Sequence, residues 1–412
     1  MAYARRKVIF LLAFTFCSVL LAHASHEKTV YAFGAPGSGD GMYPWGNLVA
    51  DSAGNLYGAT QSGGAYDAGI IFELSPGTKG EWTETVLHHF DYPSGDGGYP
   101  MAGLVFDAAG NLYGTGSSGG LNGTGVIFEL SPQSGDWNYK VIYSFGPYPG
   151  SDGVAPNSAL LIDKLGNIYG TTFEGGVDSG CFEGCGTVFE LSPADKGWSE
   201  QVIHAFSPNS SDGELPAGVV FGLGAALYGT TQNGGGSANA GVLYRLKYSK
   251  STNTWNETIL HTFTSAANDA GFPEAPLLYR RGILYGTSEG GGLNDHGTVF
   301  ETTYSKTSDW STTVLYSFGT SYGDVFSPQA SVVMDHGSLY GTATYGGKYN
   351  YYGGVFKLSK SSDGNWSETV LHSFNGTDGD VLSGALLLQD GWFYGNSRTG
   401  GDSSGLVYAV KP

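Results

Sequence analysis

Hydrophobic and polar positions alternate in short runs along this 412-residue chain. The segments "GTVFELSP" at 186–193 and "WSETVLHSF" at 366–374 place apolar side chains at every second position over much of their length. Such alternation is typical of half-buried β-strands, and no segment after the N-terminal apolar run sustains the 3.6-residue period of an amphipathic helix. The pattern therefore predicts an all-β protein.

A tyrosine followed by glycine recurs at intervals of 54 to 59 residues. The seven tyrosines are Tyr57, Tyr113, Tyr169, Tyr228, Tyr285, Tyr340 and Tyr394. Each copy predicts four short strands: an apolar strand, the tyrosine strand, a strand like "GTVFEL", and a strand that begins at tryptophan. In the first three copies, Asp-x-x-Gly-Asn turns at 51–55, 107–111 and 163–167 suit tight hairpins between the first two strands. A repeat of this length indicates a propeller or a solenoid.

The last copy lacks its fourth strand, and "KTVYAF" at 28–33 matches the fourth-strand pattern "ETVLHSF". A closed ring, in which the N-terminal strand completes the last blade, explains both features. A solenoid would need capping units at its ends instead. We therefore predict one domain over residues 25–412, a seven-bladed β-propeller of four-stranded blades.

The repeated pattern "LYGTT…GG…GTVFEL…W.ETVLHSF" resembles the bacterial GloVer tandem repeat, and the resemblance covers essentially the whole chain after residue 24. It implies an exported, propeller-like repeat protein and no particular biochemical activity. Members of that family often carry C-terminal anchors. This chain ends at the last blade, which favours free secretion.

Residues 1–24 are typical of a signal peptide, with a basic "MAYARRK", an apolar run and Ala22-His23-Ala24 as the cleavage site. A single membrane anchor is the alternative, although the apolar run is shorter than a span needs. Removal of this segment, which holds three basic residues and no acid, changes the formal charge from −18 to −21. Such a charge disfavours nucleic acid and anionic membranes as partners. We expect a monomer that is secreted or periplasmic.

Two cysteines remain after the leader, Cys181 and Cys185 in "SGCFEGCG". A local disulfide is the expected state in an oxidising compartment. Free thiols are the alternative, and two cysteines without a second pair are a poor metal site.

Residues that recur in every copy are expected to serve the frame. The tyrosines should wedge between neighbouring blades, and the glycine after each should let backbones approach closely. An aspartate between blades also recurs, and two interpretations are open for it. Asx turns are one; the other is weak calcium binding through oxygen ligands, for which the candidates are Asp40, Asp96, Asp152 and Asp212.

Function should lie where the copies differ, on the face with the long loops. There the mouth of the expected channel collects polar and aromatic side chains, as binding sites do. The candidate ligand-binding residues are Gln61, Glu174, Gln232, Glu289, Tyr345, Arg398, Asp295, His296 and Trp45.

Two functions fit these residues. The first is a binding or scaffold protein for an extracellular polymer, above all a glycan, whose sugar rings offer apolar faces and hydroxyl edges. The second is a polysaccharide hydrolase or lyase with Glu174, Glu289, His296 or Arg398 as catalytic residues, since paired carboxylates can cleave glycosidic bonds. The chain contains none of the common hydrolase, metalloprotease, phosphate-binding or dinucleotide-binding motifs.

Overall fold

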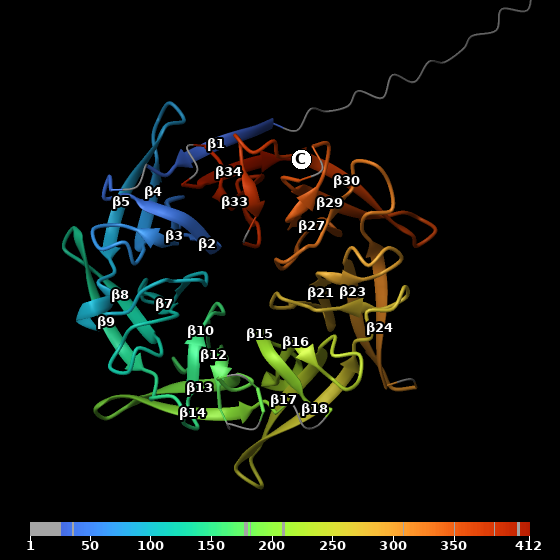
Figure 1. Ribbon diagram of the computed structural model, residues 1–412, viewed down its shortest axis with the longest axis horizontal. Helices are drawn as coiled ribbons and strands as arrows, with labels where there is room; N and C mark the ends of the chain where they lie inside the picture. The colour runs from blue at the N-terminus through green and yellow to red at the C-terminus, as the bar shows by residue number, and fades with distance from the viewer. Residues whose placement is uncertain are drawn as a thin grey trace, which may run out of the picture.

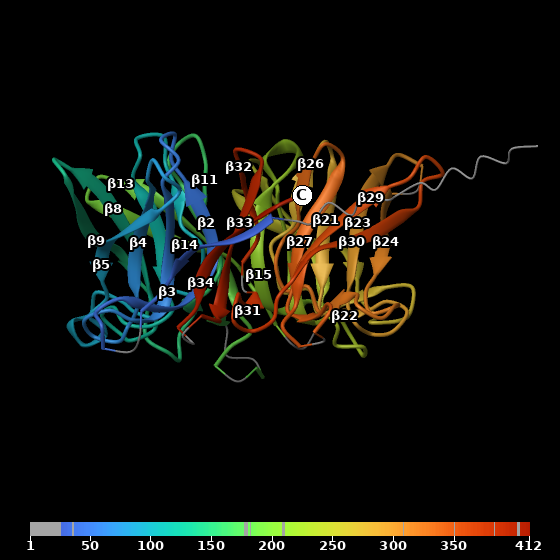
Figure 2. The same ribbon diagram turned by 90° about the horizontal axis from the view of Figure 1, so that it is seen from above.

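The computed structural model is a ring of seven antiparallel β-sheets around a central axis (Figure 1). It describes residues 26–412 except 35–36, 177–179, 182, 208–210, 308, 350, 383 and 402–403. The predicted leader, 1–24, lies outside the described residues. Seen edge-on, the long loops lie on one side of the ring and the tight hairpin turns on the other (Figure 2).

Each blade is a four-stranded sheet whose strands run outward from the axis in chain order. The first blade contains β2 (Gly41–Ala50), β3 (Leu56–Gly63), β4 (Ile70–Pro76) and β5 (Trp82–His89), and the second contains β6 (Val105–Phe106), β7 (Leu112–Gly116), β8 (Val126–Gln133) and β9 (Asp136–Ser144). The third blade contains β10 (Gly153–Pro156), β11 (Leu161–Ile162), β12 (Ile168–Gly175), β13 (Thr187–Ala194) and β14 (Gly197–Ala205). The fourth blade contains β15 (Gly213–Phe221), β16 (Leu227–Gly234), β17 (Val242–Ser249) and β18 (Thr254–Thr262).

The fifth blade contains β19 (Ala270–Gly271), β20 (Leu278–Arg280), β21 (Ile283–Ser288), β22 (Gly290–Gly291), β23 (Thr298–Ser305) and β24 (Asp309–Ser317). The sixth blade contains β25 (Val325–Phe326), β26 (Val333–Asp335), β27 (Ser338–Ala343), β28 (Tyr345–Gly346), β29 (Gly354–Lys360) and β30 (Trp366–Ser373). The seventh blade contains β31 (Asp380–Leu382), β32 (Leu387–Gln389), β33 (Trp392–Thr399) and β34 (Leu406–Lys411), and β1 (His26–Ala32) is its outermost strand. Two short 3-10 turns, η1 (Tyr92–Ser94) and η2 (Leu223–Ala225), lie in connections. Within the described ranges, no helix has the length and apolar character needed to cross a membrane.

The ring closes as predicted. Strand β1 pairs antiparallel with β34, from His26 opposite Lys411 to Ala32 opposite Leu406 (Figure 1). On the inner side of the same seam, the Asn396 amide donates a hydrogen bond of 2.9 Å to the carbonyl of Gly46. The first and last blades are therefore joined both by a backbone ladder at the outer edge and by a side-chain contact near the axis.

The repeated tyrosines pack between blades, as predicted. Tyr57 is 4% exposed and contacts Phe106 and Trp137 of the following blade in edge-to-face geometry. The glycine after it makes room for a ring rather than for a second backbone: a Cβ on Gly58 would lie 2.6 Å from Cζ of Phe72. The tyrosine and the glycine repeat together because both are needed for close packing. The tyrosine ring fills the space between two blades, and the glycine leaves room for the aromatic ring of the third strand within its own blade.

A second set of contacts joins neighbouring blades on the long-loop face. The residue before each inter-blade proline has a positive φ, for example 59° at Tyr43, and its N–H donates to the preceding blade. At the closing seam, Tyr43 N–H donates to the Ser404 carbonyl at 2.8 Å. A Cβ on Gly405 would lie 2.4 Å from Cδ of Pro44, so glycine is required for the two blades to approach. These contacts fix the height of each blade relative to the next.

Candidate functional site

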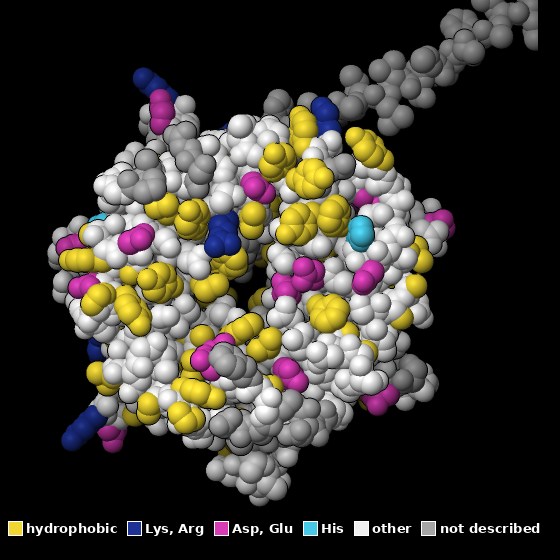
Figure 3. Space-filling model, in the orientation of Figure 1, with side chains coloured by type: hydrophobic (Ala, Val, Ile, Leu, Met, Phe, Trp, Pro, Cys, Tyr) yellow, Lys and Arg dark blue, Asp and Glu magenta, His cyan; other side chains and the backbone are white. Residues whose placement is uncertain are grey.

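The channel mouth on the long-loop face is hollowed into a cavity of about 350 Å³ to which all seven blades contribute. The residue after each inter-blade proline lines it, among them Trp45, Met101, Asn157, Glu274 and Gln329. Figure 3 shows this face, with a central opening bordered by hydrophobic side chains, basic atoms on one side and acidic atoms opposite. The mouth therefore differs in charge from one side to the other.

The basic side of the mouth is built by the last and first blades. The guanidinium carbon of Arg398 lies 5.0 Å from the ring centre of Trp45 and 5.6 Å from that of Tyr43. Its Nη2 donates to Oε1 of Gln61 at 3.2 Å. Cation–π stacking on two rings holds the arginine while part of its donor set stays available. The predicted residues Gln61, Trp45 and Arg398 thus form one cluster, of which Trp45 is the member that lines the cavity.

The acidic side of the mouth is a pair of carboxyl groups from one blade. Glu274 and Glu289 hydrogen-bond to each other, and the Gln232 amide donates to Glu274. Burial, followed by repulsion from and hydrogen bonding with Glu289, raises the pKa of Glu274 to about 8. With this raised pKa, Glu274 is mostly protonated near neutral pH and can act as a hydrogen-bond donor. Gln232 and Glu289 are predicted residues that the structure brings together.

A second carboxyl pair lies beside the disulfide. Cys181 and Cys185 are bonded, as expected, which fits an oxidising compartment. Their loop carries Glu183, whose carbonyl accepts the N–H of Gly175 at 2.7 Å. Burial and the hydrogen bond with Glu183 raise the pKa of Glu174 to about 7. The disulfide loop therefore holds Glu183 against Glu174, which is not among the residues that line the central cavity.

The remaining candidates lie in outer loops. Asp295 Oδ1 accepts hydrogen bonds from Gly291 N–H at 2.7 Å and from the Ser265 hydroxyl at 3.1 Å, so it shapes its own turn. His296 and Tyr345 flank the ring of Phe326, with centroid distances of 5.0 and 5.6 Å. The Tyr345 side chain is 43% exposed. These two form an aromatic group apart from the residues that line the cavity.

The inter-blade aspartates have the hydrogen bonds of Asx-type turns. Asp40 accepts the N–H groups of Gly34 and Gly41, each at 2.6 Å, and the equivalent aspartates accept similar backbone donors. Calcium binding by Asp40, Asp96, Asp152 and Asp212 stays a prediction. In addition, most of these aspartates accept a hydrogen bond from a histidine or tyrosine of the preceding fourth strand, a partner that sequence reasoning missed.

Glu274 is the main residue that sequence reasoning missed at the mouth. Its register position holds Trp45, Met101, Asn157, Ala217 and Gln329 in other blades. Trp45 was chosen at this position for its aromatic ring, whereas the acidic residue at the same position of the fifth blade was not considered. The sequence did contain a signal: the residue after the repeated proline varies from copy to copy, so the propeller frame does not require a particular side chain there.

The pattern of the repeats is also that of a known family. The model of the Gloeobacter/Verrucomicrobia repeat matches residues 19–182 and 175–408. The chain belongs to this family. No curated protein matches the chain at a significant level.

Solved structures similar to this member of the repeat family share its fold at low sequence identity. An ancestral GH74 enzyme aligns with 94% of the chain at TM-score 0.56 and 11% identity, and the chain spans 51% of that protein. An ulvan lyase of polysaccharide lyase family PL25 aligns at TM-score 0.56 and 11% identity, over 93% of this chain and 95% of the lyase. PorZ of Porphyromonas gingivalis, a surface component of the type-IX secretion system, aligns at TM-score 0.52 and 15% identity, over 92% of this chain and 48% of PorZ. At these identities the similarity establishes the propeller fold alone.

Proposed function

We propose that this protein is an exported glycan-binding propeller whose ligand lies across the channel mouth on the long-loop face. The observation that carries the proposal is a cavity lined by Trp45, Gln232 and Glu274, with Arg398 stacked on Trp45 and Tyr43 and hydrogen-bonded to Gln61. Aromatic faces pack on sugar rings, while the amide, guanidinium and carboxyl groups match hydroxyl edges. The disulfide and the predicted leader support export.

Arg398 gives the mouth a local site for an acidic sugar, although the formal charge of −21 after the leader repels acidic polymers over the rest of the surface. Arg398 offers the planar donors that recognise carboxylate or sulfate. The protonated carboxyl of the pair adds a donor where an ionised pair would repel the polymer. The ulvan lyase among the similar folds was solved with a sulfated uronate-containing saccharide, -[GlcA(1-4)Rha3S]-, which agrees with this class.

A polysaccharide lyase is the second candidate, favoured by the carboxyl pair itself. In elimination, a base removes the proton next to the uronate carboxyl group and the glycosidic oxygen leaves from the adjacent carbon. Glu274, with its pKa of about 8, is suited to proton transfer near neutral pH. Hydrolysis by two carboxylates is less well supported, because that mechanism separates the groups by about 5–10 Å, whereas these two are in hydrogen-bonding contact.

A glycan array that includes uronate-rich and sulfated polymers, followed by calorimetry on each hit, tests the binding function. Ultraviolet absorbance of unsaturated uronate ends, measured on the same polymers, detects elimination. Binding without product supports the binding protein, and product formation supports the lyase. An array without a hit among acidic or neutral glycans contradicts both.

Arg398→Ala and Glu289→Gln are the informative variants once a ligand is found. We expect Arg398→Ala to weaken binding by roughly tenfold or more, as loss of a central arginine commonly does. Lys164→Ala is the matched control, because Lys164 is exposed in a hairpin turn on the opposite face. Normal binding by both mouth variants together with weakened binding by Lys164→Ala would place the ligand on the wrong face for this proposal.

A further inference from the structure

The seven junctions between blades repeat one arrangement with different side chains. At each junction, a histidine or tyrosine near the end of a fourth strand faces the inter-blade aspartate, and a third residue approaches from the fourth strand of the next blade. Tyr31, Asp40 and Glu84 form the junction between the last and first blades. In three junctions the first residue is tyrosine, and its hydroxyl can reach the glutamate.

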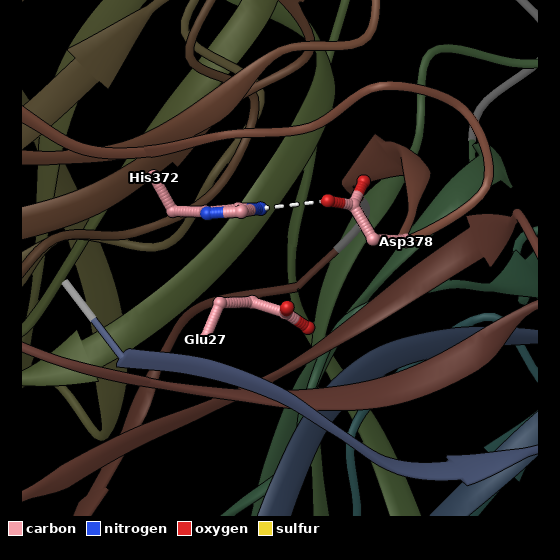
Figure 4. A group of neighbouring side chains, drawn as sticks. All are labelled: Glu27, His372 and Asp378. Atoms are coloured by element: carbon pink, nitrogen blue, oxygen red, sulfur yellow. Dashed lines mark hydrogen bonds and ion pairs between the residues drawn. The ribbon is translucent and has the colours of Figure 1, made fainter. Parts of the chain in front are cut away.

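Two of the junctions combine histidine with both carboxylates. The residues are Glu27, His372 and Asp378 at one and His204, Asp212 and Glu257 at the other, and in each set one ligand atom per residue lies within 4.8 Å of the others. Figure 4 shows the first set: the His372 imidazole points at the Asp378 carboxylate, and the Glu27 carboxylate approaches the same space from β1. These three residues come from strand β30, the connection to the last blade, and the N-terminal strand.

The distances distinguish these two junctions from the other histidine junctions. Where the third residue is tyrosine or threonine, His88 and His261 lie 3.0 and 2.9 Å from their aspartates, as in ordinary hydrogen bonds. Where it is glutamate, the separations widen to 3.2 Å for His372 and 3.4 Å for His204. A tetrahedral zinc ion with bonds of about 2.0–2.1 Å holds its ligand atoms about 3.3 Å apart. The two His–Asp separations are close to that spacing, while the glutamate oxygen lies 3.6 Å from His204 at the second set and within 4.8 Å of both other ligand atoms at the first.

The Oε1 atom of Glu27 is buried and has no hydrogen-bond partner among the described residues, and the same holds for Glu257 at the second set and for the glutamates of the tyrosine junctions. What sets Glu27 and Glu257 apart is the histidine beside them. A carboxylate oxygen of Asp378 lies within 4.8 Å of a carboxylate oxygen of Glu27, so the two like charges are close together. An unpaired buried oxygen is costly, and a cation between the two carboxylates would satisfy the oxygen and remove the repulsion.

We propose that Glu27, His372 and Asp378 bind a divalent zinc-class cation, and that His204, Asp212 and Glu257 form an equivalent second site. One imidazole nitrogen and two carboxylate oxygens suit zinc, whereas calcium takes oxygen ligands almost alone. Three protein ligands leave the fourth position to water. At the first site, the ion cross-links β1 to the sixth blade and to the connection that enters the seventh, so it strengthens the seam that closes the ring.

The test uses the purified chain after removal of metal with a chelator. Zinc is added in slight excess, unbound ion is removed by gel filtration, and retained zinc is measured by mass spectrometry alongside the melting temperature. We expect two zinc ions per chain and a higher melting temperature with zinc than with calcium. Failure of the wild-type chain to retain zinc would overturn the proposal.

Variants assign the ions to their sites. Glu27→Gln keeps the shape of the side chain and removes the repulsion from Asp378, so it should fold at least as well without metal and lose one equivalent of zinc. His372→Tyr reproduces the tyrosine junctions that this chain already contains and should lose the same equivalent. Addition of His204→Tyr should remove the second. His336→Ala, at an exposed histidine beside Asp335, is the control and should retain both ions. Full zinc retention by Glu27→Gln contradicts the site.

Discussion

Replacement of Glu368 by glutamine should stabilise this protein at alkaline pH and leave its stability almost unchanged at acidic pH. Glu368 lies at the junction between the fifth and sixth blades, where its carboxyl hydrogen-bonds Asp324 and accepts the Tyr316 hydroxyl at 3.3 Å. Burial, then repulsion from and hydrogen bonding with Asp324, raise the pKa of Glu368 from 4.5 to about 8. The folded protein therefore keeps this carboxyl protonated near neutral pH, when the unfolded chain would ionise it.

The sign of the pH dependence follows from this raised pKa. Below about pH 4.5 both states are protonated and the junction contributes its full stability; the contribution falls as pH rises through 4.5 and is lost by about pH 8. A shift of this size corresponds to at most roughly 5 kcal/mol, because an ionised side chain can turn toward solvent and recover part of it. For a chain of this size, that is on the order of 5 °C in melting temperature.

Thermal unfolding from pH 5 to pH 9 measures the effect. Glutamine is neutral and can still donate to Asp324, so Glu368→Gln should melt several degrees above wild type at pH 9 and within about 1 °C of it at pH 5. Glu81→Gln, in an exposed turn, is the matched control and should follow the wild-type curve. If Glu368→Gln instead melts lower than wild type at pH 9, the carboxylate acts there as an ionised acceptor and the reasoning fails.

Three other perturbations test the frame. Deletion of residues 26–34 removes β1 and exposes the edge of the last blade, so it should lower the melting temperature or cause aggregation; unchanged stability would contradict the closed ring. Tyr285→Ala should cost about 3–5 kcal/mol in unfolding free energy, because this side chain is 7% exposed between blades; a loss below about 1 kcal/mol would contradict its packing role. Without reductant, intact-mass analysis should show no alkylation of Cys181 or Cys185, whereas labelling of both would contradict the disulfide.

The fold could be predicted from sequence because the ring imposes the same physical demand seven times. Tyr57 and its equivalents must fill the space between two blades, and Gly58 and its equivalents must leave room for the third-strand ring, so substitutions are restricted in every copy. The closing strand was visible for the same reason, since 28–33 had to satisfy the register of a fourth strand. Periodicity reports what all blades share.

The candidate site was predicted in part, because periodicity cannot report which unlike residues meet. Gln61, Trp45 and Arg398 come from copies at opposite ends of the chain, and only ring closure brings them together. Glu274 was missed because its partner Glu289 lies in a different segment of the same copy, and the distance between them is not contained in the sequence alone. His296 and Tyr345, by contrast, were chosen for chemistry and lie in an outer aromatic group.

Raised glutamate pKa values do not by themselves locate function in this protein. The glutamates at blade junctions have raised pKa values too: about 8 for Glu84 and Glu368, equal to that of Glu274 at the mouth, and about 7 for Glu200 and Glu257. The junction glutamates recur in register beside an aspartate that the turns require, so their burial is a consequence of how blades pack. The Glu274–Glu289 pair has no such repeat, and Glu274 lines the central cavity together with Trp45, on which Arg398 stacks. Placement, rather than the size of the pKa shift, is therefore what separates a carboxyl group that can meet a ligand from one that holds two blades together.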